Sequence, residues 1–313
     1  MTEKPLVSII INCYNGERYL RETIDSVMAQ TYDNWELIFW DNQSTDSTRE
    51  IVESYHESRI HYLYAPKHTP LGEARNLAMK TVTGNYLTFL DADDVWIKDF
   101  LRRGLDVLCN NPVIKAYYSN YYCKYPNYSK IWINNKQTGV RTINDLVRSY
   151  DVAMSGCIVS MSIIRDNNIL FKNDFQLIED FDYYVNIALH TDYFYDNTPL
   201  LYYRIHESTS IKYRGKWYHE FKHFYAFLEG LKNRNILNDS DLNEIRMKLF
   251  ITKLDENIEK GERMKCFINL IRNNKYLRYS WKYFFYVLFG TKVFDYIKHN
   301  DLKKLFISFF SSK

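Results

Sequence analysis

The amino-acid sequence predicts an α/β protein with a Rossmann-like, mostly parallel mixed sheet, followed by a helical subdomain at the C-terminus. Short β-rich runs alternate with helical patterns over the first hundred residues, which is typical of βαβ units. From Trp217 onward the pattern becomes almost wholly helical. The length of 313 residues also exceeds what one hydrophobic core usually supports.

Four strands with helices between them are expected in the first 110 residues. The strands are short apolar runs, and the helices place apolar residues at helical spacing. The helix after the second strand is expected to start near Thr45 or Asp46, where capping side chains cluster. The expected strands are 7–11, 35–40, 60–64 and 86–90, and the other expected helices are 17–30, 72–81 and 95–109.

The second half of the sheet is expected to be mixed. The runs AYYSNYYCKY and KIWI are rich in aromatic residues and read as strands. A later helix is expected over residues 181–190. We place the boundary with the helical region near Gly215.

Cysteine usage and the N-terminus favour a cytoplasmic protein. The five cysteines form no CxxC pair, so neither a disulfide framework nor a zinc site is indicated. The first residues, MTEKPLVSIIINCYNG, lack the architecture of a signal peptide. We therefore expect the chain in the cytoplasm, either free or peripheral on the cytoplasmic face of a membrane.

Basic charge is concentrated near the C-terminus. Residues 261–313 carry 11 Lys and Arg against 3 Asp and Glu. This tail predicts contact with an anionic inner-leaflet surface, although a packed subdomain with a solvated basic face is equally compatible. The segment YSWKYFFYVLFG is too apolar for an RNA-binding arm, so no nucleic acid partner is expected. The expected interfacial residues are Lys282, Lys292, Lys298, Lys303 and Lys304, interleaved with Trp281, Phe284, Phe285, Phe289, Phe294 and Phe306.

The sequence DADD, residues 91–94, follows the fourth expected strand. Ligands of open α/β sheets bind outside the carboxyl ends of the strands, and strand alternation places Asp91 and Asp93 on one side. Two carboxylates there suit Mn²⁺ or Mg²⁺, which would bridge diphosphate oxygens. Alternatively, Asp93 or Asp94 caps the following helix.

Polar residues also follow the first two expected strands, at the same predicted sheet edge. They are Asn12, Tyr14 and Asn15 after the first strand, and Asp41 and Asn42 after the second. The ring of Tyr14 can stack on a base. The carboxylate of Asp41 can accept a hydrogen bond from a base imide N–H, which favours uracil. Turn or cap chemistry is the alternative for each.

Three segments together resemble the inverting family 2 glycosyltransferases of the GT-A fold. They are VSIIINCYNGERYLRETIDSVMAQTYDNWELIFWDNQSTDST, GEARNLA and GNYLTFLDADD, and the resemblance covers roughly residues 5–210. It implies transfer of a sugar from a nucleotide diphosphate donor to a hydroxyl. It also implies a catalytic domain over residues 1–215, with a nucleotide-sugar half (about 1–110) and an acceptor half (about 111–215), before the helical region 216–313.

The resemblance implies roles for individual residues. Asp93 would hold the metal. Arg75 would contact donor phosphates or base, since its fork matches phosphate geometry, and a surface ion pair is its alternative role. The implied nucleotide-binding residues are Asn12, Tyr14, Asp41, Asn42, Arg75, Asp91 and Ala92.

Two departures from the family pattern leave the base open. Asn12 stands where Thr or Pro is usual, and Asn42 replaces a second Asp. Uridine is favoured, with thymidine and guanosine diphosphate sugars as alternatives.

The segment QLIEDFDYYVNIALH matches the family's second acidic motif. The match implies that Asp180 is the catalytic base, taking the proton of the acceptor hydroxyl, and that Glu179 orients the acceptor or Asp180. We expect the helix dipole to keep Asp180 ionised. A plain N-cap is the alternative, and Asp182 is expected at the solvated surface.

The segment YYRIHESTS resembles the family's closing motif. It implies His206 as a further metal ligand and Arg204 as a contact to donor phosphate. A histidine satisfied by its surroundings is the alternative. Ser208 and Ser210 are expected in a loop that orders over the donor.

Other functions fit less well. The first turn, NCYNGE, lacks the GxGxxG fingerprint of dinucleotide-dependent oxidoreductases and the Gly-rich phosphate loop of nucleotidyltransferases. A non-catalytic glycan- or nucleotide-binding module of the same fold remains the alternative. The favoured hypothesis is an inverting transfer to a cell-surface glycan or a lipid-linked acceptor.

Overall fold

The computed structural model describes residues 4–133, 136–173, 175–206 and 217–273. The chain divides into two compact units, residues 1–209 and residues 210–313. Ser208, Ser210, the expected boundary near Gly215 and the expected interfacial tail residues from Trp281 to Phe306 lie outside the described residues.

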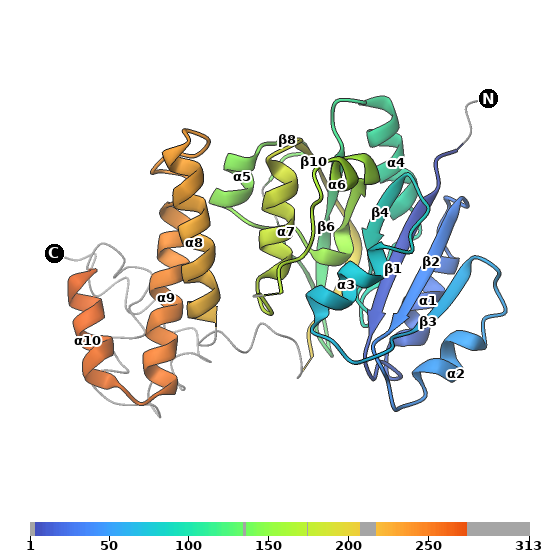
Figure 1. Cartoon of the computed structure of the whole chain (residues 1–313), viewed down its shortest axis with the longest axis horizontal. Helices are drawn as coiled ribbons and strands as arrows, with labels where there is room; N and C mark the ends of the chain where they lie inside the picture. Colours follow the sequence, from blue (N-terminus) through green and yellow to red (C-terminus); the bar gives the residue numbers. More distant parts are fainter. Residues whose placement is uncertain (1–3, 134–135, 174, 207–216, 274–313) are drawn as a thin grey trace. The chain divides into compact units, whose positions relative to one another are not determined.

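The first unit contains a ten-stranded sheet with the order β3-β2-β1-β4-β9-β6-β10-β5, while β7 pairs with β6 and β8 with β10 (Figure 1). This confirms the expected mostly parallel mixed sheet. The strands are β1 (Val7–Cys13), β2 (Trp35–Asp41), β3 (Ile60–Tyr64), β4 (Tyr86–Phe89), β5 (Val95–Trp96), β6 (Ala116–Lys124), β7 (Ser129–Ile131), β8 (Gly139–Arg141), β9 (Cys157–Ser160) and β10 (Tyr193–Arg204).

The strand directions bring distant segments to one sheet edge. Strands β1 to β4 are parallel where they pair. Strand β9 is antiparallel to both β4 and β6, and β10 is parallel to β6. Strands β6 and β10 therefore run in the same direction as β4, and the carboxyl ends of β1 to β4, β6 and β10 meet at the same edge.

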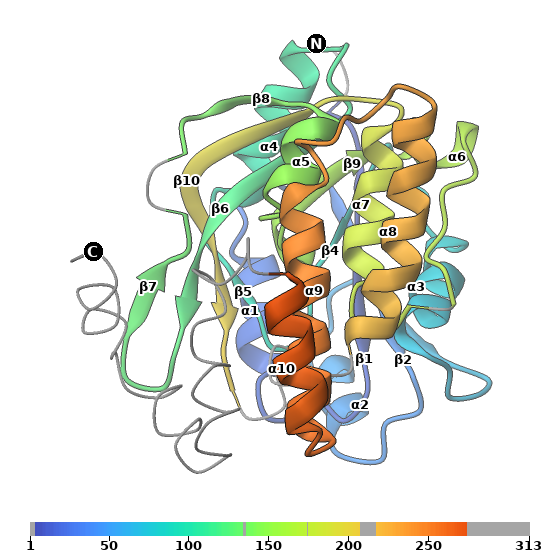
Figure 2. The same ribbon diagram turned by 90° about the vertical axis from the view of Figure 1, so that its left-hand side faces the viewer.

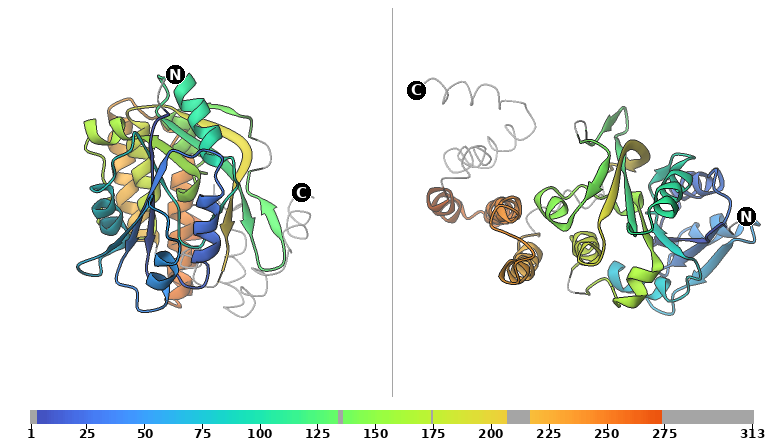
Figure 3. Two further views of the ribbon diagram at one scale, coloured as in Figure 1. Left: turned by 90° about the vertical axis from the view of Figure 1, so that its right-hand side faces the viewer. Right: turned by 90° about the horizontal axis from the view of Figure 1, so that it is seen from above.

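Alternating side chains of the strands bury both faces of the sheet. Ile9 and Ile11 pack in one apolar cluster, and Ile10 packs in another on the opposite face. The helices α1 (Leu20–Met28), α2 (Thr48–Glu53) and α4 (Phe100–Asn110) contribute to the first cluster. The second is covered by α3 (Leu71–Met79), α5 (Ile143–Arg148), a 3-10 turn η1 (Met154–Gly156), α6 (Met161–Asp166) and α7 (Glu179–Ala188), so the sheet lies between helical layers (Figure 3).

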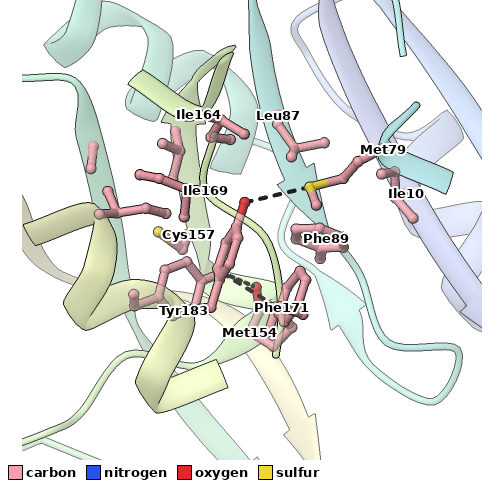
Figure 4. Close-up of a cluster of buried hydrophobic side chains, with 14 of the residues drawn as sticks. Ile10, Met79, Leu87, Phe89, Met154, Cys157, Ile164, Ile169, Phe171 and Tyr183 are labelled. Atoms are coloured by element: carbon pink, nitrogen blue, oxygen red, sulfur yellow. Dashed lines mark hydrogen bonds between the residues drawn. The ribbon is translucent and has the colours of Figure 1, made fainter. Parts of the chain in front are cut away.

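The second cluster fixes α3 and α7 against the sheet (Figure 4). The ring of Tyr183 on α7 stacks on Phe171 with centroids 4.0 Å apart and an interplanar angle of 7°. Its hydroxyl donates to the sulfur of Met79 on α3 at 3.6 Å. The first turns of these two helices consequently have fixed positions beside the carboxyl edge of the sheet.

Several predicted helix boundaries were wrong. Helix α1 begins at Leu20 instead of 17, α2 begins at Thr48 instead of Thr45 or Asp46, and α7 begins two residues before the expected 181. The largest error concerns Val95–Trp96, which was expected to open a helix. These two residues form β5 because they pair with Leu201 and Tyr202 of β10, and α4 starts only at Phe100.

The second unit is helical in its described part, with α8 (Trp217–Asn233), α9 (Asn243–Glu259) and α10 (Arg263–Arg272). Helices α9 and α10 share a small apolar core of Phe250, Leu254, Cys266 and Leu270. Within the described ranges, no helix combines the length and apolar character needed to span a bilayer.

Candidate active site

Arg75 is the centre of a buried charge cluster at the carboxyl edge of the sheet. It lies on α3, and its side chain is 4% exposed. One terminal nitrogen lies 3.1 Å from Asp91 Oδ1, and the other lies 3.1 Å from Glu179 Oε1. The alternative of a surface ion pair is therefore wrong. The guanidinium joins the DADD loop to the first turn of α7, while its contact to donor phosphate stays a prediction.

Glu179 and Asp180 are the first two residues of α7, and both lie in a buried environment that disfavours their charged forms. Burial raises the pKa of Glu179 to about 7, and the Arg75 guanidinium opposes this rise. Burial likewise raises the pKa of Asp180 to about 6, again opposed by Arg75. Desolvation therefore makes Asp180 take up a proton at a higher pH than an exposed aspartate, while the expectation that the helix dipole keeps it ionised stays a prediction. The helix follows an N-cap at Ile178, so Asp180 is not the cap.

Asp182 does not lie at the solvated surface, as was expected. It is fully buried, and its carboxylate accepts from Lys172 at 2.6 Å and from Asn186 at 3.1 Å. The physical reason is helical spacing, since residue 182 shares a helix face with the buried Glu179, three positions earlier.

Asp93 and His206 meet although they are 113 residues apart. Asp93 Oδ2 lies 2.6 Å from His206 Nε2, and both side chains remain partly exposed. Across the described ranges, no group of three or more His, Cys, Asp or Glu converges as a metal cage. One carboxylate and one imidazole still fit a cation that takes its other ligands from water and a diphosphate.

Asp94 is a buried anchor that the sequence analysis considered only as a helix cap. It accepts from the Ser155 hydroxyl at 2.6 Å and from the Arg204 backbone N–H at 3.0 Å. Burial raises its pKa well above the usual range, with Asp93 adding to the effect. The N-cap of α4 is Asp99, so neither Asp93 nor Asp94 caps it. Asp94 instead joins the DADD loop to the end of β10.

Arg204 directs its guanidinium at other protein groups. Nε donates to the Asp93 carbonyl at 2.8 Å, and Nη2 donates to Glu22 at 2.9 Å. The group also lies over the Tyr19 ring, 4.3 Å from its centroid. These contacts hold the segment that leads to His206, and a direct contact of Arg204 to donor phosphate stays a prediction.

Ala92 stands between Asp91 and Asp93 in the sequence, and its carbonyl accepts from the Thr23 hydroxyl at 3.0 Å. This contact ties the DADD loop to α1. The proposed contact of Ala92 to the nucleotide is a backbone role that these bonds leave untested.

At the end of β1, Tyr14 has an exposed ring and Asn12 has a buried amide without a hydrogen-bond partner among the described residues. Tyr14 is 54% exposed, and its ring meets the edge of His68 at 4.5 Å. Both polar atoms of the Asn12 amide are buried without a hydrogen-bond partner in the described structure. Such orphaned groups are rare in folded proteins and often mark a site that a ligand completes. His68 was not singled out from the sequence, which offers no periodic signal for it.

Asp41 and Asn42 are already engaged with the protein. Asp41 is fully buried and accepts from the Ser44 N–H and the Tyr62 hydroxyl, both at 2.7 Å. The amide of Asn42 donates to the Thr69 carbonyl at 2.7 Å. These bonds shape the loops around Tyr14, and a direct contact of Asp41 to a base stays a prediction.

The comparisons with known proteins decide the family. Residues 8–167 match the family described as Glycosyl transferase family 2. The chain belongs to this family. This glycosyltransferase is 32% identical over 188 residues to WfgD of Escherichia coli, named a UDP-Glc:alpha-D-GlcNAc-diphosphoundecaprenol beta-1,3-glucosyltransferase, covering 60% of this chain and 70% of WfgD. It is 41% identical over 107 residues to TuaG of Bacillus subtilis, a putative teichuronic acid biosynthesis glycosyltransferase, covering 34% of this chain and 42% of TuaG.

Solved structures support the GT-A-like fold of this glycosyltransferase. The crystal structure of S. aureus TarS 1–349 in complex with UDP has a TM-score of 0.59 and 19% identity, and the match covers 80% of this chain and 71% of TarS. The mannosyltransferase PcManGT from Pyrobaculum calidifontis, in complex with GDP-Man and Mn²⁺, has a TM-score of 0.55 and 18% identity, covering 73% and 65%. The expected fold class and enzyme class are both confirmed.

Proposed function

We propose that this glycosyltransferase moves a sugar, with inversion, from a nucleotide diphosphate sugar to a hydroxyl of a cell-surface or lipid-linked glycan. The observation that carries the proposal is the single cluster in which Arg75 bridges Asp91 and Glu179, with Asp180 next in the chain. The carboxylates that we assign to the donor side (Asp91) and to the acceptor side (Glu179 and Asp180) thus lie at the same sheet edge, which supports a direct displacement.

The donor is proposed to bind across the ends of β1, β2 and β4. The exposed Tyr14 ring offers a stacking surface, and the orphaned Asn12 amide offers both a donor and an acceptor. A uridine diphosphate sugar is favoured. WfgD, by its name, uses UDP-Glc, and TarS was crystallised with UDP, whereas PcManGT was crystallised with GDP-Man.

Mn²⁺ or Mg²⁺ is proposed to be held by Asp93 and His206. A divalent cation there would stabilise the negative charge of the leaving nucleotide diphosphate. The 2.6 Å separation of Asp93 Oδ2 and His206 Nε2 supports this assignment, because it holds a carboxylate and an imidazole side by side. PcManGT contains Mn²⁺ in its complex, which is a property of that protein.

Asp180 is proposed to accept the proton of the acceptor hydroxyl. As the acceptor oxygen bonds to the anomeric carbon, the bond from that carbon to the diphosphate breaks and the nucleotide diphosphate departs with the electron pair. A base whose pKa lies near the working pH is favourable for this transfer, and the Asp180 pKa of about 6 fits. Glu179, held by Arg75, would orient the acceptor or Asp180.

A lipid-linked acceptor would place the enzyme at the inner leaflet of a membrane. WfgD, by its name, acts on a diphosphoundecaprenol-linked sugar, and TuaG is assigned to teichuronic acid biosynthesis. The basic tail of residues 261–313 supports a peripheral location on the cytoplasmic face.

Calorimetry with UDP, GDP, TDP, CDP and ADP, each with Mn²⁺ and with EDTA, tests the donor site. Wild type should bind one nucleotide class in a metal-dependent manner, Asp93→Ala should lose this binding, and Asp180→Asn should keep it. Release of UDP from UDP-sugars, with and without added glycan acceptors, then tests catalysis. Nucleotide binding without turnover on any donor would favour the non-catalytic binding module, and no binding at all would contradict the proposal.

A further inference from the structure

Strands β6 and β7 form a hairpin in a segment of the chain without acidic side chains. Residues 107–144 contain no Asp or Glu, although they include Lys115, Lys124, Lys130, Lys136 and Arg141. Outside the C-terminal tail the chain carries an excess of negative charge. The hairpin, residues 121–132, is therefore a local positive feature on an otherwise acidic catalytic unit.

The hairpin exposes aromatic rings that stack in pairs. Tyr128 is 61% exposed and Trp132 is 50% exposed. Tyr125 and Tyr128 stack with ring centroids 4.6 Å apart, and Trp132 stacks on Tyr121 at 5.9 Å. Backbone bonds of 2.8 and 2.9 Å across the hairpin fix both pairs. Clustered exposed aromatic side chains of this kind mark an interaction surface, whereas a single one needs no explanation.

The turn end of the hairpin adjoins the candidate metal ligands. Lys124 at the end of β6 is in register with Arg204 of β10, and the Ile205 N–H donates to the Lys124 carbonyl at 2.9 Å. His206 is the next residue in the chain. Figure 2 shows the hairpin at the border of the sheet, with its turn pointing away from the sheet centre.

We propose that the β6–β7 hairpin docks on an anionic lipid bilayer, with Tyr125, Tyr128, Lys130 and Trp132 in the headgroup region. Tyr and Trp favour this region because one end of each ring is polar and the rest is apolar. Basic side chains are attracted to the negative surface potential of anionic lipids. If the acceptor is lipid-linked, as in the proposed function, such docking delivers it beside Asp93 and His206.

A soluble glycan fits this surface less well than a bilayer does. Sugar hydroxyls are recognised by carboxylates and amides next to an open aromatic face. No carboxylate occurs in residues 107–144, and the faces of Tyr125 and Tyr128 are turned to each other. The exposed combination of ring edges, indole and lysine matches a lipid headgroup layer.

Sedimentation of the full chain with phosphatidylcholine vesicles, with and without phosphatidylglycerol, tests the docking. The variants are Tyr128→Ser/Trp132→Ser and Lys130→Glu. Matched controls are Val113→Ser/Leu170→Ser, two exposed apolar residues elsewhere, and the exposed Lys80→Glu. Binding to anionic vesicles should weaken roughly tenfold in each hairpin variant and remain unchanged in the controls. Thermal unfolding of all variants should match that of the wild-type chain, which shows that they are folded.

Quenching by lipids brominated on their acyl chains locates Trp132 directly. In Trp217→Phe/Trp281→Phe, the remaining tryptophans besides Trp132 are Trp35, Trp40 and Trp96, which are at most 8% exposed. Anionic vesicles should therefore quench Trp132 in this variant.

Any of three results would overturn the docking proposal. The first is that the wild-type chain fails to bind vesicles, the second is that the hairpin variants bind as well as the control variants, and the third is that the bound protein shows no quenching of Trp132. A higher KM for a water-soluble acceptor together with unchanged vesicle binding would assign the hairpin to glycan recognition instead. Because vesicle binding needs no turnover, failure of the proposed enzymatic function would be seen separately.

Discussion

Arg75 and Glu179 form a buried ion pair, with a distance of 3.1 Å between Nη1 and Oε1 and side-chain exposures of 4% and 10%. The pair connects α3 to α7 across 104 residues of sequence. It also brings the DADD loop into the same network through Asp91. Disturbing Arg75 should therefore affect stability and catalysis together.

Arg75→Met should lower the free energy of unfolding by about 3 to 5 kcal/mol, because it leaves the buried Glu179 carboxyl without its cationic partner. Urea unfolding measures this loss. Arg49→Met is the control, since it breaks an exposed pair with Glu53 and should leave stability within error. Equal effects in the two variants would show that the buried network does not stabilise the fold. Arg75→Lys should lie between wild type and Met, because lysine keeps the charge but loses the fork.

Activity should rise with pH through the range set by the acidic pair at the start of α7. Their pKa values are raised to about 6 for Asp180 and about 7 for Glu179, so both carboxyls gain protons as the pH falls towards 5. A protonated Asp180 cannot accept the proton of the acceptor, so kcat/KM for the acceptor should fall on the acid side. The rate is measured at saturating donor and metal.

Calorimetry of nucleotide binding over the same pH range is the control for this profile. Constant nucleotide affinity with falling turnover would assign the acid limb to the base. A rate that stays level from pH 5 to pH 8 would contradict the role of Asp180, as would an Asp180→Asn variant with wild-type turnover.

Asn12→Ala should separate ligand binding from stability. The Asn12 amide has no partner among the described residues, so its removal should leave the free energy of unfolding unchanged or raise it. Nucleotide affinity should fall by roughly tenfold, the value of one or two lost hydrogen bonds.

Asn42→Ala is the matched control for Asn12→Ala. Its amide is buried and bonded to Thr69, so the substitution should lower stability by about 1 to 3 kcal/mol. Chemical denaturation and calorimetry give the two quantities for each variant. If Asn12→Ala lost stability without losing nucleotide affinity, the amide would not belong to the donor site.

Gly16→Ala should destabilise the loop after β1. A Cβ atom at position 16 would lie 2.4 Å from the sulfur of Cys13, and the next neighbour would be 3.6 Å away. Overpacking of this kind costs about 1 to 3 kcal/mol. Cys13→Ala removes the clashing atom, so the double variant should recover part of the loss. A double-mutant cycle measures this coupling, and strictly additive effects would show that the clash is relieved in another way.

The strands of the nucleotide half were predictable because their signals are local. Runs such as VSIII and WELIFW combine β-branched and aromatic residues over a few positions, and the structure contains β1 and β2 there. The parallel order then followed from alternation with helices, so the gathering of Asn12, Asp41 and DADD at one edge followed as well. The prediction of a helix at Val95–Trp96 was wrong because these residues pair with β10, about a hundred residues later in the chain. That pairing overrides the local helical pattern.

The sequence predicted which residues lie in the candidate site, but it did not predict which of them form hydrogen bonds or ion pairs with one another. The sequence by itself determined the fold class, the family and the acidic residues at the strand ends, because composition, spacing and motif order are properties of the chain. Only the tertiary structure decided that Arg75 pairs with Glu179, that Asp94 anchors Arg204, and that Asp182 is buried. Those facts depend on which distant groups share a desolvated space, where an unpaired charge is costly and each carboxylate takes the nearest donor.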